Sequence, residues 1–302
     1  MLFSLALIPV IILLIIIYKR DKKEKEPLGL LIGLFFAGMG TVITALIIEA
    51  IGLALFDLII PYDSAVKEFL SALIIIAPAE ELGKYAVLRL ITWKNKNFNY
   101  SYDAIVYAVF VSLGFAALEN IAYVISMGLG VAILRMFTAI PGHASDAVFM
   151  GYFYSRAKYA HITGKKDEYS KNITLTLLVP IILHGFYDAI ILGGSTTDNL
   201  VLMGSSLILW IGYVIVLFVL SIITVVRASR NDFCITTFPG NIQTVYIPSV
   251  MDPWVCECGT GNNMNFCSNC GRMRPAGDIW HCRVCGCPSG YNFCACCGSP
   301  RP

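Results

Sequence analysis

Seven apolar runs, each long enough to cross a lipid bilayer, occupy the first three quarters of the chain. The 302 residues are 57% hydrophobic and only 14% charged, whereas soluble domains carry about 25% charged residues. A helix needs about 20 apolar residues to cross the hydrocarbon core. We therefore expect an all-α polytopic membrane protein with about seven transmembrane helices, six or eight being the alternatives. The runs cover residues 2–18, 28–57, 66–91, 103–126, 130–154, 172–193 and 200–226.

Basic residues occupy every second connection between these runs, and the other connections carry almost none. By the positive-inside rule, this pattern predicts an N-terminus outside the cell and a C-terminus in the cytosol. The first run has no charged segment before it and no small-residue cleavage site, so we expect a retained anchor rather than a cleaved signal peptide. The basic connections contain Lys19, Arg20, Lys22, Lys23 and Lys25, then Lys94 and Lys96, then Arg156, Lys158, Lys165, Lys166 and Lys171, and finally Arg227 and Arg230.

The third run contains three charged residues, Glu80, Glu81 and Lys84. An ionisable side chain in a bilayer costs roughly 2.5–3.5 kcal/mol on insertion scales, which makes it a functional candidate. On a helix Lys84 can contact either glutamate, so a structural ion pair would explain one of them. Adjacent glutamates project about 100° apart, and the second one needs another partner. That partner could be a metal, a histidine from another helix, or a water that the glutamate deprotonates.

The fourth and fifth runs add Glu119-Asn120 and His143. Taken alone, Glu119 could snorkel to the outer surface and Asn120 could bridge two helices. Pro141-Gly142 is expected to break the helix just before His143 and to open space around its ring. Asp146 follows three residues later and could orient the imidazole. A lone membrane histidine is usually an interhelical hydrogen-bond donor, but this combination favours a functional site.

The sixth run places His184 and Asp188 on one helix face, four residues apart. Asp188 could fix the tautomer of the ring or bind the substrate backbone, and Gly185 leaves space beside the ring. With a rise of about 1.5 Å per residue, Glu80 and both histidines fall near one layer in mid-membrane, with Glu119 closer to the outside. Carboxylates and histidines in one buried layer predict water-activating chemistry inside the membrane.

Four motifs in register over roughly residues 30 to 195 resemble those of the PrsW family of intramembrane proteases. That family is related to the CAAX-prenyl proteases, which share a Glu-Glu motif but carry a histidine where Glu119 stands. The motifs are Glu-Glu-x-x-Lys (80–84), Phe-x-x-x-Glu-Asn (115–120), Arg135-x5-Pro141-x-His143 with the later Gly151, and His-Gly-x-x-Asp (184–188).

The resemblance implies proteolysis of membrane-embedded substrates such as anti-sigma factors, by a mechanism commonly described as metal-dependent. We expect Glu80 or Glu81 to activate a water at a site formed by the two histidines, with or without a zinc ion. Lys84 would neutralise the spare carboxylate or stabilise an oxyanion. The expected site comprises Glu80, Glu81, Lys84, Glu119, His143, His184 and Asp188, of which His143, His184 and Glu119 are the candidate ligands of a catalytic metal.

Two other functions fit parts of this pattern. A non-enzymatic membrane receptor or an ion or proton transporter could use the same polar layer. Transporters often contain two related halves, however, and the spans show no internal repeat. A CAAX-type protease acting on lipidated tails is the second alternative.

All but one of the 11 cysteines lie after residue 250, in two similar units. Each unit has a tryptophan followed by two cysteine pairs about ten residues apart, which is the spacing of a four-cysteine zinc ribbon. Four thiolates around an ion can fix a fold that is too small for a core. We expect a small C-terminal double zinc-ribbon module with two structural zinc ions. Their ligands would be Cys256, Cys258, Cys267 and Cys270 in one unit, and Cys282, Cys285, Cys294 and Cys297 in the other.

Disulfides are the alternative, but a cytosolic location favours metal. The first pair is Cys-x-Cys, one residue shorter than usual, and the spare Cys287, Cys296 and His281 leave the second ligand set open. The arginines of this module are too few to predict nucleic-acid binding, and a protein partner is favoured. The expected domains are a transmembrane protease-like domain (1–227), a linker (228–252) and the cytosolic double zinc ribbon (253–302).

Overall fold

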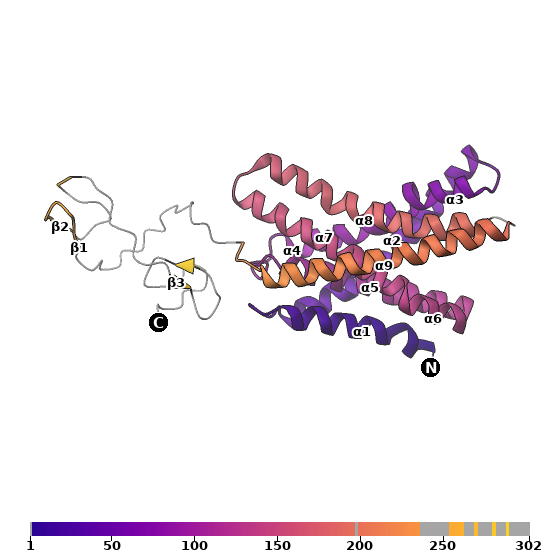
Figure 1. Cartoon of the computed structure of the whole chain (residues 1–302), viewed down its shortest axis with the longest axis horizontal. Helices are drawn as coiled ribbons and strands as arrows, with labels where there is room; N and C mark the ends of the chain where they lie inside the picture. The colour runs from indigo at the N-terminus through magenta and orange to yellow at the C-terminus, as the bar shows by residue number, and fades with distance from the viewer. Residues whose placement is uncertain are drawn as a thin grey trace. The chain divides into compact units, whose positions relative to one another are not determined.

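The computed structural model describes residues 2–196, 199–235, 254–262, 269–270, 280–281 and 288–289. The chain divides into two compact units, residues 1–235 and residues 236–302. The first unit consists of helices that lie side by side and connect at alternating ends of a bundle (Figure 1). They are α1 (Leu2–Arg20), α2 (Leu28–Ile59), α3 (Ala65–Ser71), the π-helix η1 (Ala72–Ile76), α4 (Ala77–Thr92), α5 (Asp103–Met127), α6 (Leu129–Phe137), α7 (Ala139–Ile162), α8 (Lys166–Ser195) and α9 (Leu200–Arg230).

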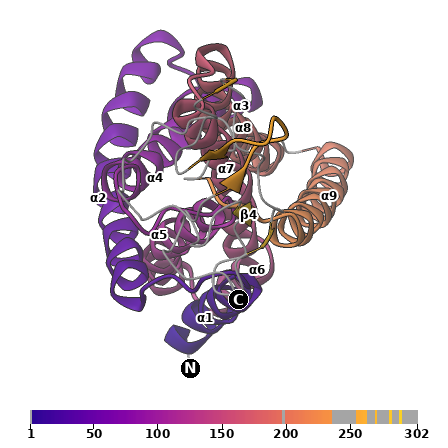
Figure 2. The same cartoon turned by 90° about the vertical axis from the view of Figure 1, so that its left-hand side faces the viewer.

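Helix α5 forms the centre of the bundle, and α1, α2 and α7 pack against it (Figure 2). Every residue of α5 from Asp103 to Ala117 is buried. Two glycines allow α2 and α5 to approach closely, because a Cβ atom on Gly38 would lie 2.0 Å from the carbonyl oxygen of Val111, and one on Gly114 would lie 2.0 Å from that of Phe35. Small residues at such crossings are typical of helix packing in membranes.

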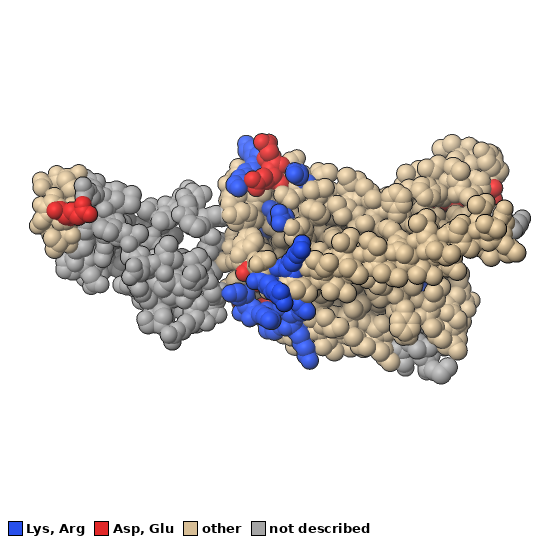
Figure 3. All heavy atoms as spheres, in the orientation of Figure 1, with Lys and Arg blue, Asp and Glu red and all other residues tan. Residues whose placement is uncertain are grey.

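Four helices in the described part of the chain, α2, α5, α8 and α9, are long and apolar enough to cross a bilayer. Large apolar side chains are exposed on their outer faces, for example Leu46 on α2 (60% exposed) and Ile208 on α9 (74%). Contact between so much apolar surface and water is unfavourable, so we expect lipid to cover these faces. The all-α membrane fold expected from the sequence is confirmed. Lysine and arginine side chains gather at the end of the bundle where α9 ends and α7 connects to α8 (Figure 3).

The fifth expected span (130–154) differs from the observed helices. It is divided between α6 and α7, with Thr138 between them at φ −122° and ψ −65°. The break therefore precedes Pro141, and the prediction that Pro141-Gly142 itself interrupts a helix was wrong. Pro141 lies in the first turn of α7. Backbone nitrogens in a first turn make no hydrogen bond within the helix, and no earlier turn is present for the proline ring to clash with.

The third expected span (66–91) corresponds to three consecutive elements, α3, η1 and α4. Pro78 lies two residues after the π-helix and is the second residue of α4. A proline cannot donate to the carbonyl four residues earlier, here that of Ile74, and the wider π turn accommodates this missing bond. The irregular turn lies one helical turn before Glu80 and Glu81.

The second unit contains two small antiparallel hairpins among its described residues. In the first, β1 (Trp254–Val255) pairs with β2 (Gly261–Asn262), and in the second, β3 (Trp280–His281) pairs with β4 (Pro288–Ser289). Each of the two repeated tryptophans begins a strand, which agrees with the internal repeat seen in the sequence. Most of the expected linker and the second cysteine set (Cys282, Cys285, Cys294, Cys297) lie outside the described residues, as does Cys267.

Candidate active site

Helix α4 carries three charged side chains into the interior of the bundle. Glu80, Glu81 and Lys84 are 6%, 0% and 1% exposed. The Lys84 ammonium donates to Glu81 Oε1 at 2.7 Å and to Glu80 Oε2 at 3.1 Å. It therefore contacts both glutamates at once, and the contacts expected from their spacing are present. The ammonium also lies 3.2 Å from His143 Nδ1 and over the ring of Phe115, 4.1 Å from its centroid.

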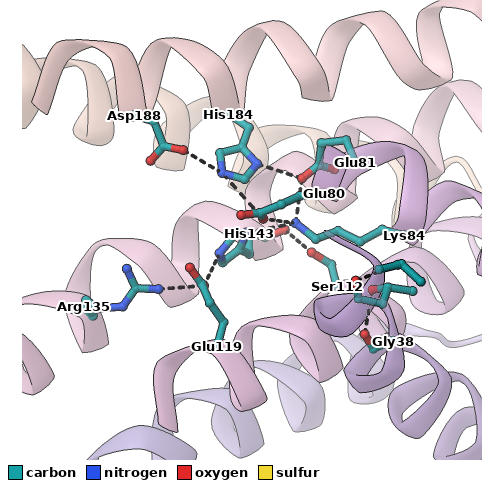
Figure 4. Close-up of polar contacts among 12 residues, drawn as sticks. Gly38, Glu80, Glu81, Lys84, Ser112, Glu119, Arg135, His143, His184 and Asp188 are labelled. Atoms are coloured by element: carbon teal, nitrogen blue, oxygen red, sulfur yellow. Dashed lines mark hydrogen bonds and ion pairs between the residues drawn. The ribbon is translucent and has the colours of Figure 1, made fainter. Parts of the chain in front are cut away.

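His184 on α8 is the second partner of the glutamates. Its Nδ1 lies 2.9 Å from Glu81 Oε1, and its Nε2 lies 3.2 Å from Asp188 Oδ2 and 3.8 Å from Glu80 Oε2 (Figure 4). Of the three partners considered for the second glutamate, the structure provides the histidine from another helix. Gly185 lets α8 approach the π-helix, because a Cβ atom there would lie 2.7 Å from Leu73 Cδ2. The space beside His184 is thus filled by a neighbouring helix.

His143 on α7 connects this group to α5 and α6. Its Nε2 lies 2.9 Å from Glu119 Oε2, and its ring packs edge-on against that of His184, with centroids 5.1 Å apart. Arg135 on α6 donates to Glu119 Oε2 at 2.6 Å and to Asn120 Oδ1 at 3.1 Å. Glu119 is therefore held between a histidine and an arginine, rather than snorkelling to the surface.

Asp146, which could have oriented His143, is not among the hydrogen-bond partners of that ring in the described part of the chain, which are Lys84 and Glu119. It is buried, and its Oδ1 has no hydrogen-bond partner among the described residues. Glu119 takes the place expected for Asp146 beside the imidazole. Ser112 on α5 fixes the backbone at this position, because its hydroxyl donates to the carbonyl oxygen of His143 at 2.9 Å.

A cavity of about 180 Å³ opens beside these residues. Glu80 is among its lining residues and Glu81 is not, so only one of the two adjacent glutamates faces the space where a substrate or water could lie. The wall also includes Glu49 from α2, which the sequence analysis missed. Its signal was present in the sequence, since an acid inside an apolar run is itself a functional candidate. The other polar or aromatic lining residues are Phe115, Glu119, Tyr123, Arg135, His143, Asp146, His184, Tyr187 and Asp188.

The donor set suits a metal ion. Glu80, Glu81, His143 and His184 each offer one ligand atom, all within 4.8 Å of one another. Imidazole nitrogens with carboxylate oxygens are ligands that zinc takes in hydrolytic sites. Glu81 Oε2 is buried without a hydrogen-bond partner among the described residues, so one oxygen remains available. Glu119 is not one of these four residues; its Oε2 lies 2.9 Å from His143 Nε2 and accepts from Arg135.

The net negative charge of the site also favours binding of a cation. Six carboxylates belong to the cavity and its adjoining glutamate pair, against two permanent cations, Lys84 and Arg135. With both imidazoles neutral and every carboxyl ionised, the excess would be four negative charges. Burying uncompensated charge is costly, so protons, imidazolium or a bound cation must offset part of it. The six are Glu49, Glu80, Glu81, Glu119, Asp146 and Asp188.

A separate cysteine group lies in the second unit. Cys256, Cys258 and Cys270 each place a sulfur within 4.8 Å of the others, and Cys256 Sγ lies 3.6 Å from Cys270 Sγ. Sulfurs bound tetrahedrally to zinc at about 2.3 Å would lie about 3.8 Å apart, which is close to this separation. The group is compatible with a small zinc-binding module.

Comparisons with known proteins point to one family. Residues 26–224 match a family model described as PrsW family intramembrane metalloprotease. The chain is 37% identical to Protease PrsW of Oceanobacillus iheyensis over 69% of this chain and 90% of that protein. It is 35% identical to Protease PrsW of Geobacillus kaustophilus (63% and 80%) and 33% identical to that of Bacillus subtilis (62% and 81%). No solved structure matches.

Proposed function

The chain belongs to the PrsW family and is an intramembrane protease, and we propose that Glu80, Glu81, His143 and His184 form its catalytic centre. The convergence of these four buried side chains from three helices, next to a cavity, carries the proposal. A peptide bond in that cavity would be hydrolysed by a water that a carboxylate deprotonates. The substrates would be membrane-embedded proteins, of which an anti-sigma-type factor is one candidate.

Glu80 is the proposed general base. Glu81 Oε1 already accepts from Lys84 and meets His184, and the side chain is fully buried. Glu80 lines the cavity, and its contacts to Lys84 (3.1 Å) and His184 (3.8 Å) are longer than those of Glu81, which leaves it better placed to take a proton from water. The Lys84 ammonium lies close enough to stabilise negative charge developing on the substrate carbonyl oxygen.

Glu119 and Asp188 are proposed as positioning residues. Each holds the Nε2 side of one histidine, Glu119 on His143 at 2.9 Å and Asp188 on His184 at 3.2 Å. Carboxylates in such positions fix the tautomer and orientation of imidazoles that bind metals or move protons. Arg135 holds Glu119 in turn. This assignment differs from the expectation that Glu119 itself binds a metal.

We further propose that His143 and His184, with Glu80 or Glu81, hold a catalytic zinc ion. When bound, zinc would make an attached water more acidic and polarise the scissile carbonyl. The chain's own residues would position the water, accept its proton and exclude bulk solvent from the cavity. The family description supports this metal dependence.

The cysteine module is proposed to be a cytosolic double zinc ribbon that docks a protein partner. Its zinc sites would be closed and structural, since four thiolates leave no open position for chemistry. The orientation with the N-terminus outside is supported by the basic residues at one end of the bundle (Figure 3).

Glutamine variants test the catalytic centre. Glu80→Gln and Glu81→Gln keep the side-chain shape and lose its basicity, and each should lower cleavage of a reconstituted transmembrane substrate by about 10²–10⁴-fold. The control is Glu168→Gln, because that glutamate is exposed and forms an ion pair with Lys165 on the surface. Both catalytic variants should remain folded and inserted. Cleavage at wild-type rates in both would refute the assignment of this pair.

Metal analysis of the full chain tests the zinc proposal. The double variant His143→Ala/His184→Ala should contain one zinc ion fewer per chain than the wild type, because the cysteine module is the same in both proteins. Its activity should also fall by more than lost stability can explain, because deleting a hydrogen bond in a membrane costs only about 0.6–1.7 kcal/mol. Equal metal content would rule out a zinc ion on the histidines while leaving their role in proton transfer open to the activity measurement.

A further inference from the structure

A second cluster of buried acids lies at the end of the bundle where α1 ends and α5 begins. Asp21 follows α1, Glu26 precedes α2 and Asp103 is the first residue of α5. Their exposed fractions are 1%, 2% and 0%. One carboxylate oxygen from each lies within 4.8 Å of the others. This cluster is separate from the glutamates and histidines of the candidate active site.

The cluster is held in place but not neutralised. Asp103 Oδ2 accepts from the backbone nitrogens of Asn99 (3.0 Å) and Tyr100 (2.7 Å), and Glu26 Oε2 accepts from the Tyr107 hydroxyl. Asp103 Oδ1 and both carboxylate oxygens of Asp21 are buried without a hydrogen-bond partner among the described residues.

The basic side chains nearby do not compensate these charges. Within the described part of the chain, none of the three acids forms an ion pair with a lysine or arginine. The ammonium of Lys25, the nearest candidate, donates to the backbone oxygens of Tyr18 and Asp21 instead of to a carboxylate. Lys25 therefore adds some positive field and leaves the Asp21 carboxylate unbound.

Buried acids without a counter-charge are costly. Asp232, just after α9, adds further negative charge near Asp21, and its Oδ1 accepts from Ser101 Oγ at 2.8 Å. A fold that gathers four acids here and leaves oxygens unbound has a ready place for a cation.

We propose that Asp21, Glu26 and Asp103 bind a hard divalent cation, Mg²⁺ or Ca²⁺, at this end of the bundle. The donor atoms are all oxygens, which these ions prefer, whereas zinc favours nitrogen and sulfur ligands. The two unbound oxygens of Asp21 and the unbound Oδ1 of Asp103 provide free ligand positions. A bound ion would fasten the connection between α1 and α2 to the start of the central helix α5.

Thermal unfolding with and without each ion tests this site. The full-length protein in detergent, kept at constant free zinc, is titrated with Ca²⁺ or Mg²⁺ alone. At a hundredfold excess over Kd the wild type should gain about 5 °C in Tm. Asp21→Asn should abolish that gain, and Asp63→Asn, an exposed acid at the opposite end of the bundle, should retain it. The ion that raises the Tm at the lower concentration, Ca²⁺ or Mg²⁺, is the one that the site prefers.

The sign of the Asp21→Asn effect separates a cation site from a merely buried acid. Among the described residues the Asp21 carboxylate has no hydrogen-bond partner, so without a divalent ion its replacement removes mainly a buried charge and should raise Tm. With the ion present, the same replacement removes a ligand and should lower Tm below that of the wild type. The proposal is overturned if neither ion raises the wild-type Tm at concentrations up to about 10 mM, or if Asp21→Asn shows the wild-type gain.

Discussion

Lys84 is the residue on which the polar contacts of the site converge. Its ammonium reaches Glu80, Glu81 and the Nδ1 of His143 within 3.2 Å, while the side chain is 1% exposed. A buried ion pair contributes little net stability compared with apolar residues, but breaking one leaves an uncompensated charge. Lys84 is therefore needed as the counter-charge of the two buried glutamates, and its loss should reduce the stability of the fold as well as the activity.

Lys84→Met should destabilise the protein on the order of 3–5 kcal/mol, because two buried carboxylates lose their common counter-charge. The double variant Lys84→Met/Glu81→Gln should recover part of the lost stability, since only one uncompensated glutamate then remains. Neither variant should regain cleavage. Thermal unfolding of the single and double variants measures the coupling, and a Lys84→Met protein as stable as the wild type would contradict this role.

At the residue scale, contacts within one helix were predictable and contacts between helices were not. The spacing of Glu80, Glu81 and Lys84 fixes their contacts once the segment is helical. The ion pair between Glu119 and Arg135 depends instead on the turn between α5 and α6, where Gly128 has φ +81°. Nothing local in the sequence sets how far that turn brings two helices together.

At the element scale, the close approach of α2 to α5 depends on the absence of side chains at two positions. Gly38 and Gly114 each face a backbone carbonyl of the opposite helix. Because residues of both α2 and α5 line the cavity, among them Glu49 and Glu119, widening this crossing would move these two walls of the cavity apart. The sequence pattern revealed the two helices but not the face on which they meet.

A matched pair of alanine variants on α2 tests this crossing. Gly38→Ala places a methyl group 2.0 Å from the Val111 carbonyl oxygen and should destabilise the bundle by about 1–3 kcal/mol, with a loss of activity. Gly40→Ala adds the same group where nothing lies within 4 Å, and should be neutral or stabilising by up to about 1 kcal/mol. Thermal unfolding compares them, and equal effects of the two substitutions would show that the close approach is unimportant.

At the scale of the whole molecule, the apolar runs and the position of the cysteines in the sequence predict a helical membrane part followed by a cysteine-rich part. Length and apolarity located the apolar parts of the helices, because a bilayer imposes both, but α7 ends eight residues after its expected span (162 against 154) and α8 begins six residues before its own (166 against 172). The main error concerned α6 and α7, where a short helix and a new helix start replace one continuous span. Apolarity alone does not show where such a chain bends, since both segments are apolar enough to be in contact with lipid.

Zinc in the cysteine-rich unit is the prediction that connects this unit to the orientation of the whole chain. The purified protein should contain two zinc ions in residues 253–302, in addition to any ion at the histidines. Chelation should unfold this unit while the helical content of the membrane unit stays constant, because a fold without a core depends on its metal. Zinc analysis with far-ultraviolet circular dichroism before and after chelation measures both. Disulfides among the eight ligand cysteines in the native protein would contradict both the zinc sites and the cytosolic location, since both proposals rest on a C-terminus that faces inward.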